Sequence, residues 1–259
     1  MKIFHELPLA LMHYGYEWTD GDYCLPHLID KYDQYRLFFQ KARLDKRFII
    51  MDNGLFEGVE HTTEDLLDKI NLIRPNVFIV PDAWNDSLAT LRNAKEWINN
   101  QILPEEVELM AVCQGNDMGE LLTTYQTLVD LGYKYIALNH SSIAYKNFYP
   151  NHQPLNAQMY GRIELVRKLI ETGIVRKDIH HHLLGSSDWK EFQAYTEFDW
   201  IKSVDTSAPI INGALGIRFD HSVPYIKPKE KLEDIMEEDL SGQIEDIIFN
   251  VEKFKSQLK

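Results

Sequence analysis

Short apolar runs alternate along this chain with longer segments that have helical spacing. The pair Thr62–Thr63 directly precedes Glu64, a pattern typical of the N-terminal cap of a helix. Apolar residues then recur at intervals of three and four, the spacing of one helix face. Comparable helical segments end at Gly132 and Gly173. Alternation of strands with helices predicts a parallel sheet. The runs that we predict as strands are Leu7–Met12, Phe48–Met51, Val77–Val80, Leu109–Cys113, Tyr135–Leu138, His182–Leu184 and Trp200–Val204, with an eighth candidate at Ile210–Ile217.

Seven or eight strand–helix units within about 220 residues predict a (β/α)8 TIM barrel, an α/β fold. An open, doubly wound sheet is the alternative. We expect a single domain over residues 1–259, with the barrel at about 1–220 and a tail at about 227–259. The tail has an apolar stripe, which predicts a C-terminal helix that closes the barrel. The stripe consists of Ile244, Ile247, Ile248, Val251 and Phe254.

Composition narrows the class of protein further. The 259 residues include 27 Lys and Arg against 40 Asp and Glu, a net charge of −13, and only two cysteines. Two cysteines exclude a disulfide scaffold and a four-cysteine zinc site. No apolar run approaches the ~20 residues needed to span a bilayer, and the N-terminus lacks a signal-peptide layout. We therefore expect a cytoplasmic protein that does not enter a membrane, in the host cytoplasm if it is viral.

Polar residues follow directly after most of the predicted strands. In a TIM barrel the carboxyl ends of the strands form the active-site face, so these residues are expected to converge. Three separate carboxylates there suit either metal binding or chemistry at an anomeric carbon, and the residues alone leave both open. The candidate site residues are Asp52, Asn53, Asp82, Gln114, Gly115, Asn139, His140 and Asp205.

The run His180–His182 has the composition of a metal site but not its geometry. Successive residues of a strand point to opposite faces, so three adjacent histidines cannot converge on one ion. We predict that these residues belong to a strand and that one of them faces the barrel interior.

Five motifs, in order over about Phe48–Pro209, resemble those of the tRNA-guanine transglycosylase family, and more closely its phage-type, DNA-modifying branch. MDNGLFEG resembles the family's D-S-G-G-[FY]-Q segment, and VPDAW the strand with its second Asp. AVCQGND resembles the V-Q-G strand, and HLLGSSDWKEF the L-x-G-x-G-x-x-[DE] turn. SVDTSAP resembles the F-D-x-x-x-P segment that carries the nucleophile.

The resemblance implies a role for each matching residue. Asp205 is implied as the nucleophile that attacks C1′, and Asp52 as the general acid and base. Asp82, Gln114 and Gly115 are implied to recognise the edges of a guanine-like base. The resemblance also implies that Phe56 stacks on that base. Asn139 and His140, together with Asn53, are implied as substrate-binding residues at the same rim.

Two departures from the family select a branch. No cysteine follows Asp205, so the family's zinc site is absent and we expect no metal and no cofactor. Pro209 is followed by Ile210, not by the arginines that serve tRNA. The expected partners are therefore DNA, with guanine flipped out of the stack, and a free 7-deazaguanine base such as preQ0.

The acidic net charge opposes DNA binding, because phosphates attract Lys and Arg. Two local basic clusters exist, at 41–47 and 227–231, and a partner protein is a further expected source of DNA contacts. An RNA-directed enzyme of the same family, a nucleoside or glycoside hydrolase, and a non-catalytic base-binding subunit remain alternatives.

Overall fold

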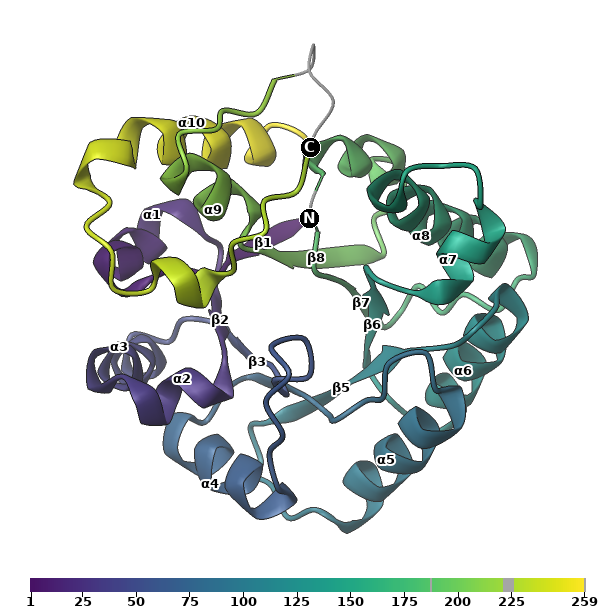
Figure 1. Ribbon diagram of the computed structural model, residues 1–259. Helices are drawn as coiled ribbons and strands as arrows, with labels where there is room; N and C mark the ends of the chain where they lie inside the picture. Colours follow the sequence, from purple (N-terminus) through teal and green to yellow (C-terminus); the bar gives the residue numbers. More distant parts are fainter. Residues whose placement is uncertain (187, 221–225, 259) are drawn as a thin grey trace.

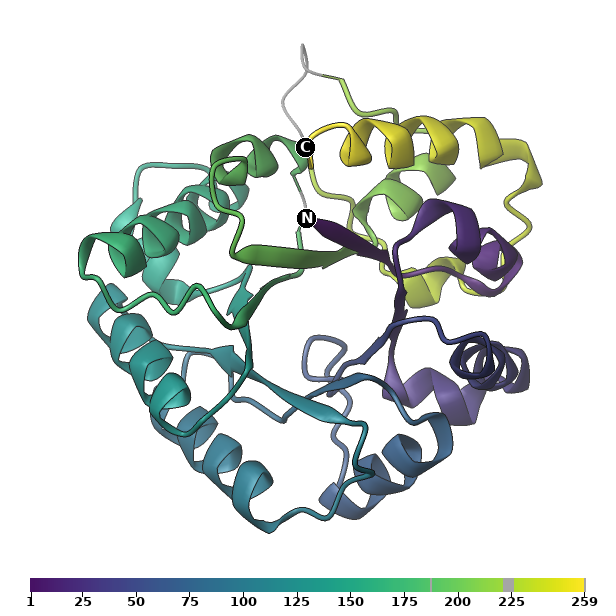
Figure 2. The same ribbon diagram turned by 180° about the vertical axis from the view of Figure 1, so that it is seen from behind.

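The computed structural model describes residues 1–186, 188–220 and 226–258. Its core is one sheet of eight parallel strands in the order β1-β8-β7-β6-β5-β4-β3-β2, which curves into a nearly closed barrel. Helices surround this ring on its outer side (Figures 1 and 2). The predicted α/β (β/α)8 TIM barrel is therefore confirmed.

The strands are short, and most of the helices lie between consecutive strands. The strands are β1 (Lys2–His5), β2 (Asp22–Cys24), β3 (Ile49–Met51), β4 (Val77–Ile79), β5 (Glu108–Cys113), β6 (Tyr135–Asn139), β7 (His180–Leu184) and β8 (Ile201–Thr206). The α-helices are α1 (Gly15–Trp18), α2 (Pro26–Lys31), α3 (Asp33–Leu44), α4 (Thr63–Ile73), α5 (Ser87–Asn100), α6 (Met118–Asp130), α7 (Ile143–Phe148), α8 (Pro154–Glu171), α9 (Ala208–Ala214) and α10 (Ile244–Lys255). The 3-10 helices are η1 (Leu9–Tyr14), η2 (Trp189–Tyr195), η3 (Leu232–Ile235) and η4 (Ser241–Gln243).

The barrel closes between β1 and β2 through the segment that leads into β2. Asp20 donates its backbone N–H to the Ile3 carbonyl at 2.9 Å, and its carboxylate accepts the Ile3 N–H at 2.8 Å. The Thr19 hydroxyl accepts the N–H of His5 at 3.2 Å. These bonds satisfy strand-edge groups that would otherwise be unpaired.

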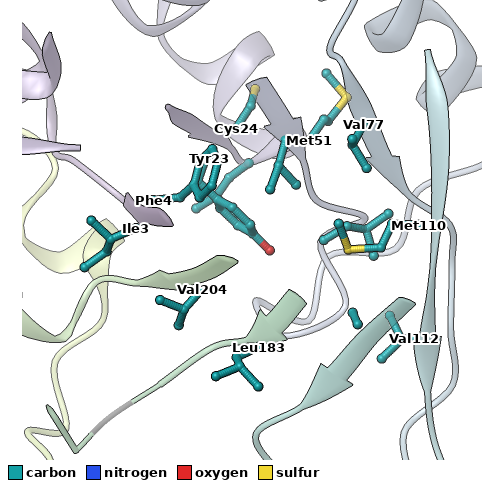
Figure 3. Close-up of a cluster of buried hydrophobic side chains, with 14 of the residues drawn as sticks. Ile3, Phe4, Tyr23, Cys24, Met51, Val77, Met110, Val112, Leu183 and Val204 are labelled. Carbon is teal, nitrogen blue, oxygen red and sulfur yellow. The ribbon is translucent and has the colours of Figure 1, made fainter. Parts of the chain in front are cut away.

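Side chains fill the interior of the barrel. Figure 3 shows Phe4, Tyr23 and Met110 among a cluster of buried side chains drawn from several strands. Tyr23 extends into the space between β2 and β8, with its hydroxyl directed away from its own strand. Because bulky buried side chains occupy it, the barrel interior is a packed core below the carboxyl ends of the strands, as is usual in this fold.

Two predicted strands were wrong. Leu7–Met12 overlaps the 3-10 helix η1 (Leu9–Tyr14), and the first strand is Lys2–His5. Pro8, which lacks a backbone N–H, caps η1 at its N-terminus. Ile210–Ile217 overlaps helix α9, in which Pro209 occupies the first turn, a position that favours helices. The three-residue strand β2 was not predicted.

The predicted C-terminal helix is α10, and it packs against α9 beside the barrel (Figure 1). Asn250 of α10 donates to the Pro209 carbonyl of α9 at 3.4 Å and to the Ile217 carbonyl, just beyond α9, at 2.7 Å, and its Oδ1 accepts the Phe219 N–H at 2.7 Å. Among the described residues, no helix is long and apolar enough to cross a membrane.

Candidate active site

A cavity of about 140 Å³ opens where the strands end at their carboxyl sides. An engineered cavity of ~150 Å³ takes up benzene, so a space of this size suits a flat ring. Eight predicted residues line it together, although they come from five strands and the loops that follow them. They are Asp52, Asn53, Phe56, Asp82, Gln114, Asn139, His140 and Asp205.

Asp205, near the end of β8, is held from two sides. Its Oδ1 accepts a hydrogen bond from Nε2 of His182 on β7 and another from the backbone N–H of Gly185, both at 2.8 Å. Its Oδ2 accepts none from any described residue. The carboxylate is 3% exposed and lines the cavity. Asp205 therefore presents one anchored and one unengaged oxygen.

Gly185 is positioned by a buried ion pair behind the site. Its φ of +70° lies in the left-handed region, which glycine adopts without strain. The Arg162 guanidinium donates to the Gly185 carbonyl at 2.8 Å and pairs with both Glu191 oxygens, at 2.7 and 2.8 Å. Arg162 and Glu191 are both fully buried. Removing one partner of such a pair typically costs about 3–5 kcal/mol, so this turn is firmly fixed.

Asp52, directly after β3, has different surroundings. It is 8% exposed, and its Oδ1 accepts the N–H of Asn53 at 2.7 Å. Burial, followed by the negative charges of Glu57, Asp205 and Asp82, raises the pKa of Asp52 well above its usual range. Asp52 therefore holds a proton more readily than an ordinary aspartate, as suits a general acid.

A chain of hydrogen bonds crosses the rim from β3 to β6. The Asn53 amide donates to one oxygen of Asp82 at 2.8 Å, and the Gln114 amide donates to the other at 2.7 Å. The Gln114 carbonyl oxygen accepts from the Asn139 amide at 2.9 Å, and Asn139 accepts from the Tyr145 hydroxyl at 3.1 Å. Each amide is thereby oriented. Both Asp82 oxygens keep further acceptor capacity, because a carboxylate offers about four acceptor positions.

Two aromatic side chains stand at the mouth of the cavity. Phe56 and Trp84 are each 50% exposed, and their ring centroids lie 6.1 Å apart, nearly edge to face. The ammonium groups of Lys227 and Lys231, from the C-terminal tail, lie 5.2 and 5.7 Å from the Phe56 centroid. A cation over an aromatic ring is attracted to it, so the tail is held near this loop.

Gly115 is the one predicted residue that is not among the described residues lining the cavity. A Cβ on it would lie 2.9 Å from the backbone nitrogen of Leu121, so it allows α6 to start close to β5. Its carbonyl accepts from the Ser142 hydroxyl at 3.1 Å. Its observed contacts are therefore structural.

The residues that line the cavity but were not predicted as site residues include Glu6, Tyr23, Glu57 and Lys227. Glu6 follows β1, and Tyr23 lies in β2, the two strands that were misplaced or not predicted. Burial, and then the charge of Asp205, raises the pKa of Glu6 well above its usual range. The signal for Glu6 was its place after the apolar pair Ile3–Phe4. Lys227 is more than 150 residues from Phe56 along the chain, and no local pattern connects them.

The three consecutive histidines point to opposite faces of β7, as predicted. His181 contacts the Tyr125 hydroxyl of α6 at 2.8 Å, on the outer face. His180 and His182 both contact the Ser203 hydroxyl, at 2.6 and 2.8 Å, so two of the three share the other face. Among the residues that the structure describes, no group of three or more His, Cys, Asp or Glu side chains is arranged to hold a metal ion.

The polar run Ser186–Asp188 after Gly185 predicts a helix start, and it includes Ser187, which lies outside the described residues. Asp188 caps the 3-10 helix η2 through the N–H of Lys190, at 2.9 Å.

No family model matches this sequence, and no curated protein matches it. The resemblance to the transglycosylases therefore rests on the five motifs themselves.

Proposed function

We propose that this protein is a base-exchange transglycosylase that replaces guanine in DNA with a 7-deazaguanine. The observation that carries the proposal is the pairing of two differently held carboxylates in one ring-sized cavity. Asp205 has an oxygen free of hydrogen bonds from described residues, and Asp52 has a raised pKa. The order of the five motifs supports the same reaction.

In the proposed reaction, Asp205 attacks C1′ of the target nucleotide and forms an ester bond to the sugar. The C1′–N9 bond breaks, its electron pair passes to the base, and Asp52 gives the departing guanine a proton. The incoming base then returns a proton to Asp52 as its N9 attacks C1′ and releases the Asp205 carboxylate. A carboxylate that traps an oxocarbenium-like centre in this way is established chemistry at anomeric carbons.

The hydrogen-bonded rim is suited to reading the base. Guanine and 7-deazaguanine present N–H donors on one edge, and the oriented carboxylate of Asp82 has acceptor capacity for them. The Asn139 amide donates to the Gln114 carbonyl oxygen and so orients the Gln114 side chain beside Asp82. Phe56 and Trp84 offer apolar ring surface at the mouth, where a base that leaves the helical stack must pass.

The tail lysines are our candidates for contacts with the DNA phosphates. In the other basic cluster, Lys41, Arg43 and Arg47 pair with Asp45, Glu106 and Asp22. Lys227 and Lys231 form no ion pair with a described residue and lie beside the cavity mouth. A phosphate next to a flipped nucleotide would come close to them.

The direct test is mass spectrometry of nucleosides from DNA incubated with the protein, with and without free preQ0. We expect a 7-deaza-2′-deoxyguanosine nucleoside from the DNA, and an equal amount of released guanine, only when the free base is supplied. Release of guanine that does not need the free base would identify a hydrolase instead. Absence of both products would contradict catalysis on DNA, and the same assay on tRNA tests the RNA-directed alternative.

A further inference from the structure

The His180–His182 run forms part of a buried polar chain that ends at Asp205. Nε2 of His180 lies 2.6 Å from the Ser203 hydroxyl oxygen, and Nδ1 of His182 lies 2.8 Å from the same atom. Nε2 of His182 then reaches Asp205 Oδ1 at 2.8 Å. His182 and Ser203 are fully buried. The chain therefore leads to the carboxylate through the barrel interior.

With both imidazole rings neutral, one assignment of the hydrogens satisfies every bond in this chain. A carboxylate oxygen accepts, so Nε2 of His182 carries the hydrogen, and Nδ1 of a neutral ring must then accept. The Ser203 hydroxyl is the donor to Nδ1, and its oxygen accepts from His180. Burial lowers the pKa of His180 to about 3, so His180 is neutral at pH 7 and donates only from its protonated nitrogen. Every donor in the chain has one acceptor.

A β-bulge makes this arrangement possible. His181 pairs with Ile201, but His182 pairs with Ser203, so Lys202 is an extra residue on β8. In a regular ladder, Lys202 would lie opposite His182, and Ser203 would be one residue further along β8. Bulges next to active sites commonly redirect a side chain in this way. The bulge places Ser203 and Asp205 on the same face as His182.

Aromatic rings confine His182 further. The Phe4 ring meets it edge-on and the Tyr23 ring lies nearly parallel to it, both with centroids 6.4 Å away. A ring enclosed by such neighbours and hydrogen-bonded at both nitrogens cannot rotate without breaking its contacts.

We infer that His182 is a positioning residue for Asp205, and that Ser203 fixes its tautomer. His182 and Gly185 anchor Oδ1, so Oδ2 is the oxygen that attacks C1′. This inference rests on the proposed function for its catalytic consequence, but the hydrogen-bond assignment does not depend on it.

The kinetic test compares His182→Leu with His182→Gln. Leu removes the donor, whereas the Gln amide places an N–H near the original Nε2 position. We expect His182→Leu to lower kcat by about 10²-fold, the usual effect of a misplaced reacting group, with little change in KM for the free base. His182→Gln should recover most of that loss.

His181→Leu is the matched control, because this neighbour is equally buried on the same strand but contacts Tyr125 on the other face. It should lower stability and leave kcat per folded molecule unchanged. A His182→Leu enzyme with the wild-type kcat, or an equal loss in His181→Leu, would overturn the inference.

A second measurement works without any activity. Long-range ¹H–¹⁵N correlation spectra of the histidine-labelled protein report which ring nitrogen carries hydrogen. We expect His182 to hold it on Nε2 alone, and Ser203→Ala to introduce the Nδ1–H form. A wild-type His182 with hydrogen on Nδ1 alone would disprove the positioning role, and hydrogen on both nitrogens would disprove the role of Ser203 in fixing the tautomer. An inactive wild type with the expected spectrum would instead refute only the proposed function.

Discussion

Asp205 and Asp52 occupy one cavity but differ in what holds them. Asp205 is anchored through one oxygen by His182 and Gly185, whereas Asp52 accepts one backbone N–H and lies among other carboxylates. Environments that differ in this way allow two identical side chains to divide the work of nucleophile and acid. Substitutions of these two residues therefore test the proposed mechanism most directly.

Asp205→Asn keeps the shape of the side chain but removes the charge that forms the ester. We expect no denaturation-resistant protein–DNA adduct from this variant, and an adduct from the wild type when labelled DNA and guanine are incubated together.

Asp52→Asn should still bind DNA but exchange bases ~10²–10⁴-fold more slowly, the usual contribution of general acid–base catalysis. An adduct that maps to Asp52 would reverse the two roles.

The raised pKa of Asp52 also makes a prediction about stability that does not involve catalysis. An acid whose pKa is higher in the folded state stabilises the fold below its unfolded pKa of about 4, and that contribution is lost as pH rises through the folded value. Asp52→Asn removes the cost of burying the ionised Asp52 carboxylate. Each unit by which folding raises the pKa of Asp52 corresponds to ~1.4 kcal/mol of stability lost when the group ionises.

We therefore expect the free energy of unfolding of Asp52→Asn to exceed that of the wild type increasingly from pH 4 to pH 8. Urea denaturation followed by circular dichroism at each pH measures this difference. A difference that stays constant or shrinks over this interval would contradict the raised pKa.

Asp82→Ala addresses the recognition of the base. The variant loses a carboxylate that is oriented by Asn53 and Gln114 and faces the cavity. Losing one charge-assisted hydrogen bond costs about 1.5–3 kcal/mol, so affinity for free 7-deazaguanine should fall roughly 10- to 150-fold by calorimetry. Unchanged affinity would exclude Asp82 from the binding edge.

Most of the candidate site was predictable at the residue scale for a simple reason. Asp52, Asp82, Gln114 and Asp205 each come at or just after the end of an apolar run, and in a TIM barrel that position is the rim. His182 was recognised only as a strand residue. Its contact with Asp205 depends on the bulge at Lys202, which strand periodicity does not reveal.

At the scale of elements, strands β3 to β8 and several of the longer helices were predicted, whereas β1, β2 and the helices α1, α2, α3 and α7 were not. Thr62 accepts the Asp65 N–H at the start of α4, as its capping pattern indicated. The equally short strands β3 (IIM) and β4 (VFI) are wholly apolar and were predicted, whereas polar residues interrupt β1 (KIFH) and β2 (DYC). Contacts from the segment between β1 and β2 hold these two strands in place. Glu6 and Tyr23 were missed because β1 and β2 were not predicted.

The contact between α9 and α10 gives a prediction at the element scale. A Cβ on Gly213 would lie 2.5 Å from Cα of Ile247, so Gly213→Ala must push the two helices apart. Overpacking of this kind usually costs about 1–3 kcal/mol, which exceeds the gain in helix propensity. Thermal or urea denaturation measures the loss.

Gly242→Ala is the control, because its Cβ would meet nothing within 4 Å. Its stability should equal or slightly exceed that of the wild type. Equal stabilities of the two variants would mean that α10 does not pack closely on α9.

At the scale of the whole molecule, the main tension lies between a net charge of −13 and a polyanionic substrate. Carboxylates gather in the cavity itself, where Glu6, Asp52, Glu57, Asp82 and Asp205 all line the wall. Such a cavity repels phosphates but suits a base with several N–H donors. The phosphates must then be held outside the cavity, and the tail lysines, which lie over Phe56 at its mouth, are our candidates to hold them.

Replacing Lys227 and Lys231 together by Gln should therefore weaken binding of DNA. Each neutralised phosphate contributes ~0.7–0.9 to the slope of log K against log salt concentration, so we expect the slope to decrease by about 1.5. Fluorescence anisotropy with labelled DNA at several salt concentrations measures it. Lys41→Gln with Arg43→Gln makes the same change of charge on α3, where both cations already have acidic partners, and should leave the slope nearly unaltered. If the two double variants lower the slope equally, DNA is attracted by overall charge and the tail has no specific part in holding it.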